Sequence, residues 1–142
     1  MKLALRIFGA VGLALLTAGT AAAQQTVIQV VDLAEKGLST EGGEATLYRV
    51  KNSNPKLCKI DVIQFGEEGR SILEFEFRSK LLAAEAREYR YKVPIAVDPK
   101  AKPKLTKKTT MADRAGRESL QKEFETYKAL FDPADLAKCL AG

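Results

Sequence analysis

The stretch SILEFEFR, residues 71–78, has the most regular period in the chain and predicts a β-strand. From Leu73 to Arg78 every second side chain is apolar and those between are charged, so one face can be buried while the other meets water. The apolar positions are Leu73, Phe75 and Phe77. This alternation is typical of an antiparallel sheet covered on one side, and the fold class depends on what surrounds the strand.

Two shorter runs before this strand fit further strands. Residues 46–51 alternate with period two, whereas residues 58–65 carry apolar side chains on both faces, which fits either a β-bulge or a strand covered on both sides. The segments NSNP, residues 52–55, and GEEG, residues 66–69, are rich in turn-forming residues and separate the runs. We therefore expect consecutive antiparallel hairpins in this part of the chain.

The segment after the strand, residues 79–91, fits two structures. Its first half, LLAAEAR, consists of helix formers, whereas Tyr89 and Tyr91 alternate with charged residues as in a strand. A turn at Ser79-Lys80 would make it a fourth strand that pairs with residues 71–78. We favour the strand, which gives an antiparallel meander of about four strands.

Residues 24–38 show apolar side chains at helical spacing, beginning with Val27, Val30 and Val31. Gly37 stands where such a helix would end. On propensity alone Val27–Val31 could also be a strand. We favour the helix and expect it on the N-terminal side of the sheet.

A longer helix is expected near the C-terminus. Leu120, Phe124, Tyr127 and Phe131 form a stripe at helical spacing, and Thr110 with Asp113 resembles a capping box. Asp132-Pro133 is typical of the start of a short last helix. The expected fold is therefore α+β, with the N-terminal helix and the longer C-terminal helix packed on one face of the meander.

The first 23 residues have the three parts of a secretory signal peptide. Lys2 and Arg6 precede an apolar run at residues 7–16 that is too short to span a bilayer, and small residues follow. We expect cleavage near Ala23-Gln24, the alternative being an uncleaved anchor. The remaining residues 24–142 would be a single extracytoplasmic domain, periplasmic or secreted, with no transmembrane segment.

The sequence contains two cysteines, Cys58 and Cys139. In an oxidising compartment an even number of cysteines is most simply explained by a disulfide, although two free thiols or pairing with another chain remain alternatives. The bond would attach the last helix to the sheet.

The net charge of +5 is unevenly distributed, because residues 92–108 contain six lysines and one aspartate. Within this lysine-rich segment, residues 98–108 (DPKAKPKLTKK) are expected to form an exposed, flexible linker. Five of its residues could bind an anionic envelope surface: Lys100, Lys102, Lys104, Lys107 and Lys108. Nucleic acid is not expected outside the cytoplasm, and a solvated linker is the alternative.

The composition excludes several catalytic classes. The chain has no histidine, which rules out Ser-His-Asp and Cys-His catalysis and His-ligated zinc. We expect no metal and no cofactor. Glu74 and Glu76 share one strand face at a separation that overlaps glycosidase spacing, so a carboxylate-based hydrolase or lyase is an alternative function. A solvated strand face explains the same two residues.

Four short segments occur in a familiar order: EGGE at 41–44, GEEG at 66–69, residues 75–82, and Arg90-Tyr91 with Pro94. Over residues 41–94 the chain resembles small exported bacterial proteins of uncharacterised function that are built on an antiparallel hairpin meander. Where those proteins usually carry an aromatic pair and a glycine near the third turn, this sequence has Phe75-Glu76-Phe77 and Ser79-Lys80. The resemblance implies a hairpin at residues 79–91 and no activity or ligand.

The function that these observations favour is a non-enzymatic envelope or periplasmic protein that binds a partner or ligand. The sheet face or the lysine segment would be the binding element. The partner would be an unidentified envelope protein or an anionic envelope polymer.

Overall fold

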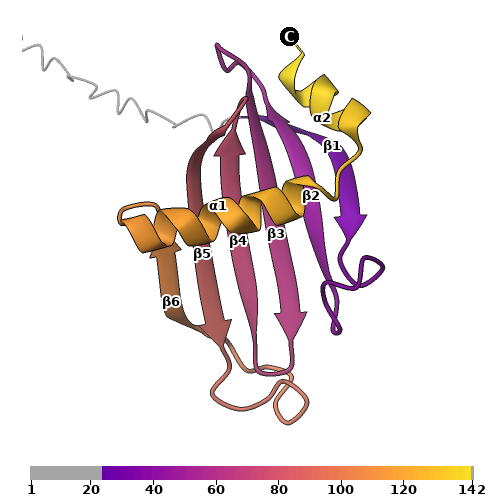
Figure 1. The fold of residues 1–142 in the computed structure, drawn as a ribbon. Helices are drawn as coiled ribbons and strands as arrows, with labels where there is room; N and C mark the ends of the chain where they lie inside the picture. The colour runs from indigo at the N-terminus through magenta and orange to yellow at the C-terminus, as the bar shows by residue number, and fades with distance from the viewer. Residues whose placement is uncertain (1–23, 142) are drawn as a thin grey trace, which may run out of the picture.

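The computed structural model describes residues 24–141, and the expected signal peptide lies outside these residues. One antiparallel sheet contains six strands, each paired with its neighbours in sequence (Figure 1). The strands are β1 (Gln25–Asp32), β2 (Gly43–Val50), β3 (Leu57–Gly66), β4 (Gly69–Phe77), β5 (Leu81–Arg90) and β6 (Lys104–Thr110). Two helices follow them, α1 (Arg114–Lys128) and α2 (Pro133–Leu140). The antiparallel α+β class expected from the sequence is confirmed.

Helix α1 lies across one face of the sheet (Figure 1), which we call the helix-covered face. The alternation in β4 is confirmed, since Leu73, Phe75 and Phe77 are buried on this face. The ring of Phe124 packs against Phe75 and Phe77, with centroid distances of 5.7 Å and 5.1 Å. Burial of these aromatic side chains attaches the helix to the middle of the sheet.

Cys58 of β3 and Cys139 of α2 form the expected disulfide, which joins positions 81 residues apart. Both cysteines are fully buried in the core. The bond lies on the helix-covered face, because Cys58 alternates with Ile60 and Val62 of the core. It therefore connects α2 directly to a central strand.

The expected N-terminal helix is wrong, because residues 25–32 form β1 at the edge of the sheet. A β-bulge between Val27 and Gln29 inserts one extra residue into the strand. Val27 and Val30 therefore share a face although they are three residues apart. The bulge produced the three-residue spacing that resembled a helix.

The number of strands also differs from the expected four. The additional strands are β1 and β6, and β5 occupies the segment that also fitted a helix. The expectation of a flexible linker over residues 98–108 is wrong for residues 104–108, which pair with β5. Its lysines suit an edge strand, since charged side chains there discourage pairing with another chain.

Helix α1 starts three residues later than its Thr110–Asp113 capping box suggested. The Asp113 side chain is the N-cap and accepts a hydrogen bond from Gly116 N at 2.7 Å, whereas Thr110 ends β6. A Cβ atom on Gly116 would lie 2.1 Å from Thr110 O. The glycine therefore allows the close approach of α1 to the end of β6. The expected start of α2 is confirmed, with Asp132 as N-cap and Pro133 in the first turn.

Candidate functional site

The face of the sheet opposite α1, called the helix-free face, carries a continuous cluster of charged side chains. Asp61, Glu74 and Glu85 are direct register partners on β3, β4 and β5. We call these three residues the acidic row. Directly opposed like charges destabilise a sheet, so three carboxylates in adjacent positions need counter-charges.

Three cations supply those counter-charges and alternate with the carboxylates. Lys59 Nζ lies 3.1 Å from Asp61 Oδ1 and 3.0 Å from Glu74 Oε1. Arg87 joins Glu74, at 2.6 Å, to Glu85, at 3.3 Å. Lys108 Nζ lies 3.0 Å from Glu85 Oε2 at the edge strand. The six residues form one continuous charge network across four strands.

Burial changes the proton affinity of two members of this network. Desolvation raises the pKa of Asp61 above its ordinary value, and this effect outweighs the attraction of Lys59. For Lys59 burial lowers the pKa, but its hydrogen bonds to Glu74 and Asp61 outweigh burial and the pKa is raised. The Lys59 side chain is only 15% exposed, less than any other member. Asp61 is therefore a carboxylate whose ionised form the fold disfavours.

A small cavity of about 200 Å³ opens beside the acidic row. Three carboxylates from three strands and several apolar or aromatic side chains line it. The lining on this face comprises Glu44, Thr46, Tyr48, Asp61, Ile63, Ile72 and Glu74. Beyond it, toward the β1 edge, Val27 and Val30 are each more than half exposed. This part of the helix-free face therefore combines negative charge with apolar surface.

The two carboxylates considered as catalytic candidates lie on this face, as their alternation implied. Glu74 is held between Lys59 and Arg87, and it lines the small cavity. Glu76 is exposed and is not part of the cavity lining. The structure therefore does not place the two carboxylates in a shared pocket.

The five lysines of the expected anionic-surface segment are exposed but do not share one face. Lys100 and Lys102 lie in the β5–β6 loop, and Lys104 begins β6. Lys107 and Lys108 are neighbours on β6, so their side chains point to opposite faces of the sheet. Lys107 Nζ lies 3.6 Å from Glu88, and Lys108 Nζ lies 3.0 Å from Glu85. Two of the five are thus already paired.

A larger cleft of about 650 Å³ lies at the end of the sheet that carries the β1–β2 loop and the β3–β4 hairpin. Its lining is mostly polar, with four carboxylates and two arginines: Glu41, Glu67, Glu68, Glu88, Arg70 and Arg90. Arg90 lies 3.4 Å from Glu68. Within residues 24–141 no group of three or more His, Cys, Asp or Glu residues could hold a metal ion.

Sequence reasoning did not single out Lys59, Asp61 or Arg87. Lys59 and Asp61 are separated by one residue, and so are Glu85 and Arg87, which places each pair on one strand face. That spacing indicates an ion pair within each strand and can be recognised in the sequence. The cross-strand register that combines the two pairs into one network required the structure.

No protein-family model, curated protein or solved structure matches this chain. In the part of the chain that the structure describes, no helix is long and apolar enough to cross a membrane.

The raised pKa of Asp61 predicts a pH-dependent effect of Asp61→Asn on stability. Because the folded pKa is higher than the unfolded value, near 3.8, ionised Asp61 lowers the free energy of unfolding as the pH rises through the folded pKa. The variant should therefore gain stability relative to the wild type between pH 4 and pH 7. Thermal unfolding across this range measures the gain, with the exposed Glu76→Gln as a control for loss of one charge. A variant less stable than the wild type at pH 7 would contradict the assignment.

Proposed function

We propose that the protein is an exported, non-enzymatic binding module that recognises a polypeptide partner in the cell envelope with its helix-free face. The partner would place a basic side chain in the cavity beside the acidic row. The observation that carries this proposal is Asp61, a half-buried carboxylate that lies beside an open cavity in the middle of an exposed sheet face. An ionisable group that lines a cavity and whose pKa is shifted by desolvation is a candidate functional residue.

The export part of the proposal has separate support. The Cys58–Cys139 disulfide fits an oxidising compartment, where such bonds persist. The charge pattern and apolar run of residues 1–16, with the small residues that follow, support a cleaved leader. Together they favour the periplasm or the exterior as the place where the module meets its partner.

The chemistry of the cavity supports a cationic group in the partner. Glu44, Asp61 and Glu74 line it from three strands, and Tyr48 adds an aromatic ring that can contact a cation. Ile63 and Ile72 can accommodate the alkyl stem of a lysine or arginine. The exposed Val27 and Val30 at the sheet edge would add apolar contact area beside this charged centre.

The alternative function, a carboxylate-based hydrolase or lyase, has less support. A retaining or inverting pair needs two carboxyl groups that face one substrate. Glu74 is held by two cations and Glu76 lies outside the cavity lining, so Glu74 and Glu76 do not form such a pair. Association of the lysine segment with an anionic surface is a separate proposal that needs no catalysis.

Site-specific photo-crosslinking in the producing cells tests the binding face. We expect a photoreactive amino acid at Val30 or Phe65, both exposed on the helix-free face, to yield one shared protein adduct. The matched control is Gln121, exposed on the outer side of α1, which should not yield it. An adduct from Gln121 but from neither face position would refute the assignment of the face.

The cationic partner group predicts a second result. Glu44→Gln combined with Asp61→Asn should reduce the adduct about tenfold or more, because each lost charge-assisted hydrogen bond contributes roughly 1.5–3 kcal/mol. Asp61→Asn is not expected to unfold the protein, so the loss would report on binding. The matched control is Glu118→Gln with Glu125→Gln, which removes two negative charges from the exposed surface of α1. Equal adduct yields from both double variants would exclude recognition through the acidic cavity.

A further inference from the structure

The β5–β6 loop, residues 91–103, exposes an apolar cluster among lysines. The apolar residues are Val93, Ile95 and Val97, with exposed fractions of 42%, 38% and 72%. Exposed lysines stand before and after them in the sequence: Lys92, Lys100, Lys102 and Lys104. Large apolar side chains seldom cluster at a surface without an interaction that covers them.

Backbone hydrogen bonds hold this loop in place. Tyr91 N donates to Glu68 O at 2.8 Å, and Ile95 N donates to Glu67 O at 3.2 Å, which attaches the loop to the β3–β4 hairpin. Val97 N donates to Pro94 O at 2.9 Å and closes a turn. The backbone of the loop is therefore held against the β3–β4 hairpin, while the three apolar side chains remain exposed to solvent.

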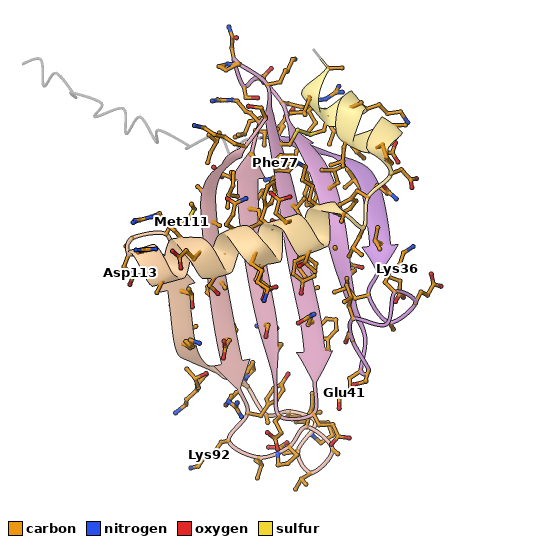
Figure 2. The ribbon with its side chains drawn as sticks, in the orientation of Figure 1. Lys36, Glu41, Phe77, Lys92, Met111 and Asp113 are labelled. Carbon is orange, nitrogen blue, oxygen red and sulfur yellow. A yellow bond between two sulfur atoms is a disulfide. The ribbon has the colours of Figure 1, made fainter. Side chains whose placement is uncertain are left out.

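The loop lies at one end of the sheet together with the β1–β2 loop and the β3–β4 hairpin (Figure 1). Figure 2 labels Lys92 at this end and Phe77 toward the other. Two further exposed apolar residues lie on the strands next to the loop, Phe65 late in β3 and Leu105 early in β6. Apolar and basic side chains thus gather at one end of the molecule.

We propose that this end docks on an anionic phospholipid bilayer. Val93, Ile95 and Val97 enter the headgroup region, and the surrounding lysines contact lipid phosphates. Lysines alone would suit any soluble polyanion, and the apolar side chains alone would suit a neutral surface. Their combination at one loop is the chemistry of an anionic membrane surface.

Acidic residues of the same end oppose this attraction in part. Glu67, Glu68 and Asp98 lie close to the lysines in the fold or the sequence, and Glu41 and Glu88 line the cleft at the same end. Glu68 is paired with Arg90, and Asp98 accepts a hydrogen bond from Lys100 N at 3.0 Å. Residues 92–104 carry four lysines against the single Asp98, so the loop itself stays positive. Binding should therefore be moderate and sensitive to salt.

A single tryptophan reports insertion directly, because the natural sequence contains none. We expect Val97→Trp in the exported protein, with its N-terminus verified by mass spectrometry, to shift its emission to shorter wavelengths with phosphatidylglycerol-containing vesicles. Phosphatidylcholine vesicles should leave it unchanged. Leu82→Trp, exposed at the opposite end of the sheet, is the control and should not respond to either. An equal response of both reporters, or none from Val97→Trp, would overturn the proposal.

Vesicle flotation tests the lysines. Each lysine near an anionic surface contributes about a fivefold factor in partitioning, so Lys100→Gln, Lys102→Gln and Lys104→Gln together should weaken binding about a hundredfold. The matched control replaces three exposed lysines of the other end, Lys51, Lys56 and Lys80, with glutamine. Similar losses in both triple variants would overturn the proposal. Glu44→Gln with Asp61→Asn should leave flotation unchanged, which separates this result from the proposed partner site.

Discussion

Replacing Cys58 and Cys139 with alanine is expected to lower the free energy of unfolding by up to about 4.5 kcal/mol. The bond joins positions 81 residues apart, so its removal returns a large amount of conformational freedom to the unfolded chain. Alanine avoids burying a new hydroxyl group where both cysteines are fully buried. Urea unfolding of the variant and the wild type measures the difference.

Reduction of the wild-type protein provides the control for this prediction. A reductant should destabilise the wild type by a similar amount and leave the double alanine variant unchanged. Hydrogen exchange should increase first in α2, because the bond attaches this short helix to β3. If the oxidised and reduced wild type unfold at the same urea concentration, the disulfide contributes nothing to stability.

Phe124→Ala should cost about 3–5 kcal/mol, the range for removing a large aromatic side chain from a packed core. Phe124 is 1% exposed and contacts Phe75 and Phe77 of β4. Its removal leaves a cavity between α1 and the centre of the sheet, and the surrounding residues can fill it only in part. The loss is measured by chemical unfolding, with circular dichroism to verify that the variant still folds.

Phe65→Ala is the matched control, because Phe65 is 49% exposed on the helix-free face. The same substitution there should change the free energy of unfolding by less than about 0.5 kcal/mol. A large gap between the two variants supports the assignment of the core to the α1 side of the sheet. Equal costs would mean that both faces are covered, which the structure does not show.

The strand at residues 71–78 could be predicted because its period and its burial are both local properties. Leu73, Phe75 and Phe77 alternate with charged residues, and all three are buried under α1. The stripe from Leu120 to Phe131 predicted a C-terminal helix for the same reason. In both segments each residue type agrees with the environment that it meets in the fold.

The sequence misled where the environment was set by neighbours in space. The bulge after Val27 gave β1 a three-residue spacing, which resembles a helix until the pairing with β2 is known. Strand β6 is polar and rich in lysine because it is an edge, and its composition alone is that of a linker. Neither strand could be recognised without its pairing partner.

The candidate site shows the same division. Glu74 and Glu76 were singled out because two carboxylates alternate on one strand, yet only Glu74 belongs to the charge network. Asp61 and Arg87 were missed, since their importance depends on the register of β3 and β5 against β4. The sequence of one strand shows which of its side chains are charged. Which charged side chains of other strands lie beside them depends on the register of the sheet.

The amino-acid sequence by itself determined the α+β class, the disulfide partners, and the alternation that divides β4 into a buried and an exposed face. These properties follow from composition and from periods that a single segment contains. Only the tertiary structure decided the six-stranded order, the acidic row and the apolar cluster of the β5–β6 loop. These depend on register and on exposure, and both arise when strands distant in sequence pair and a helix covers one of the two faces.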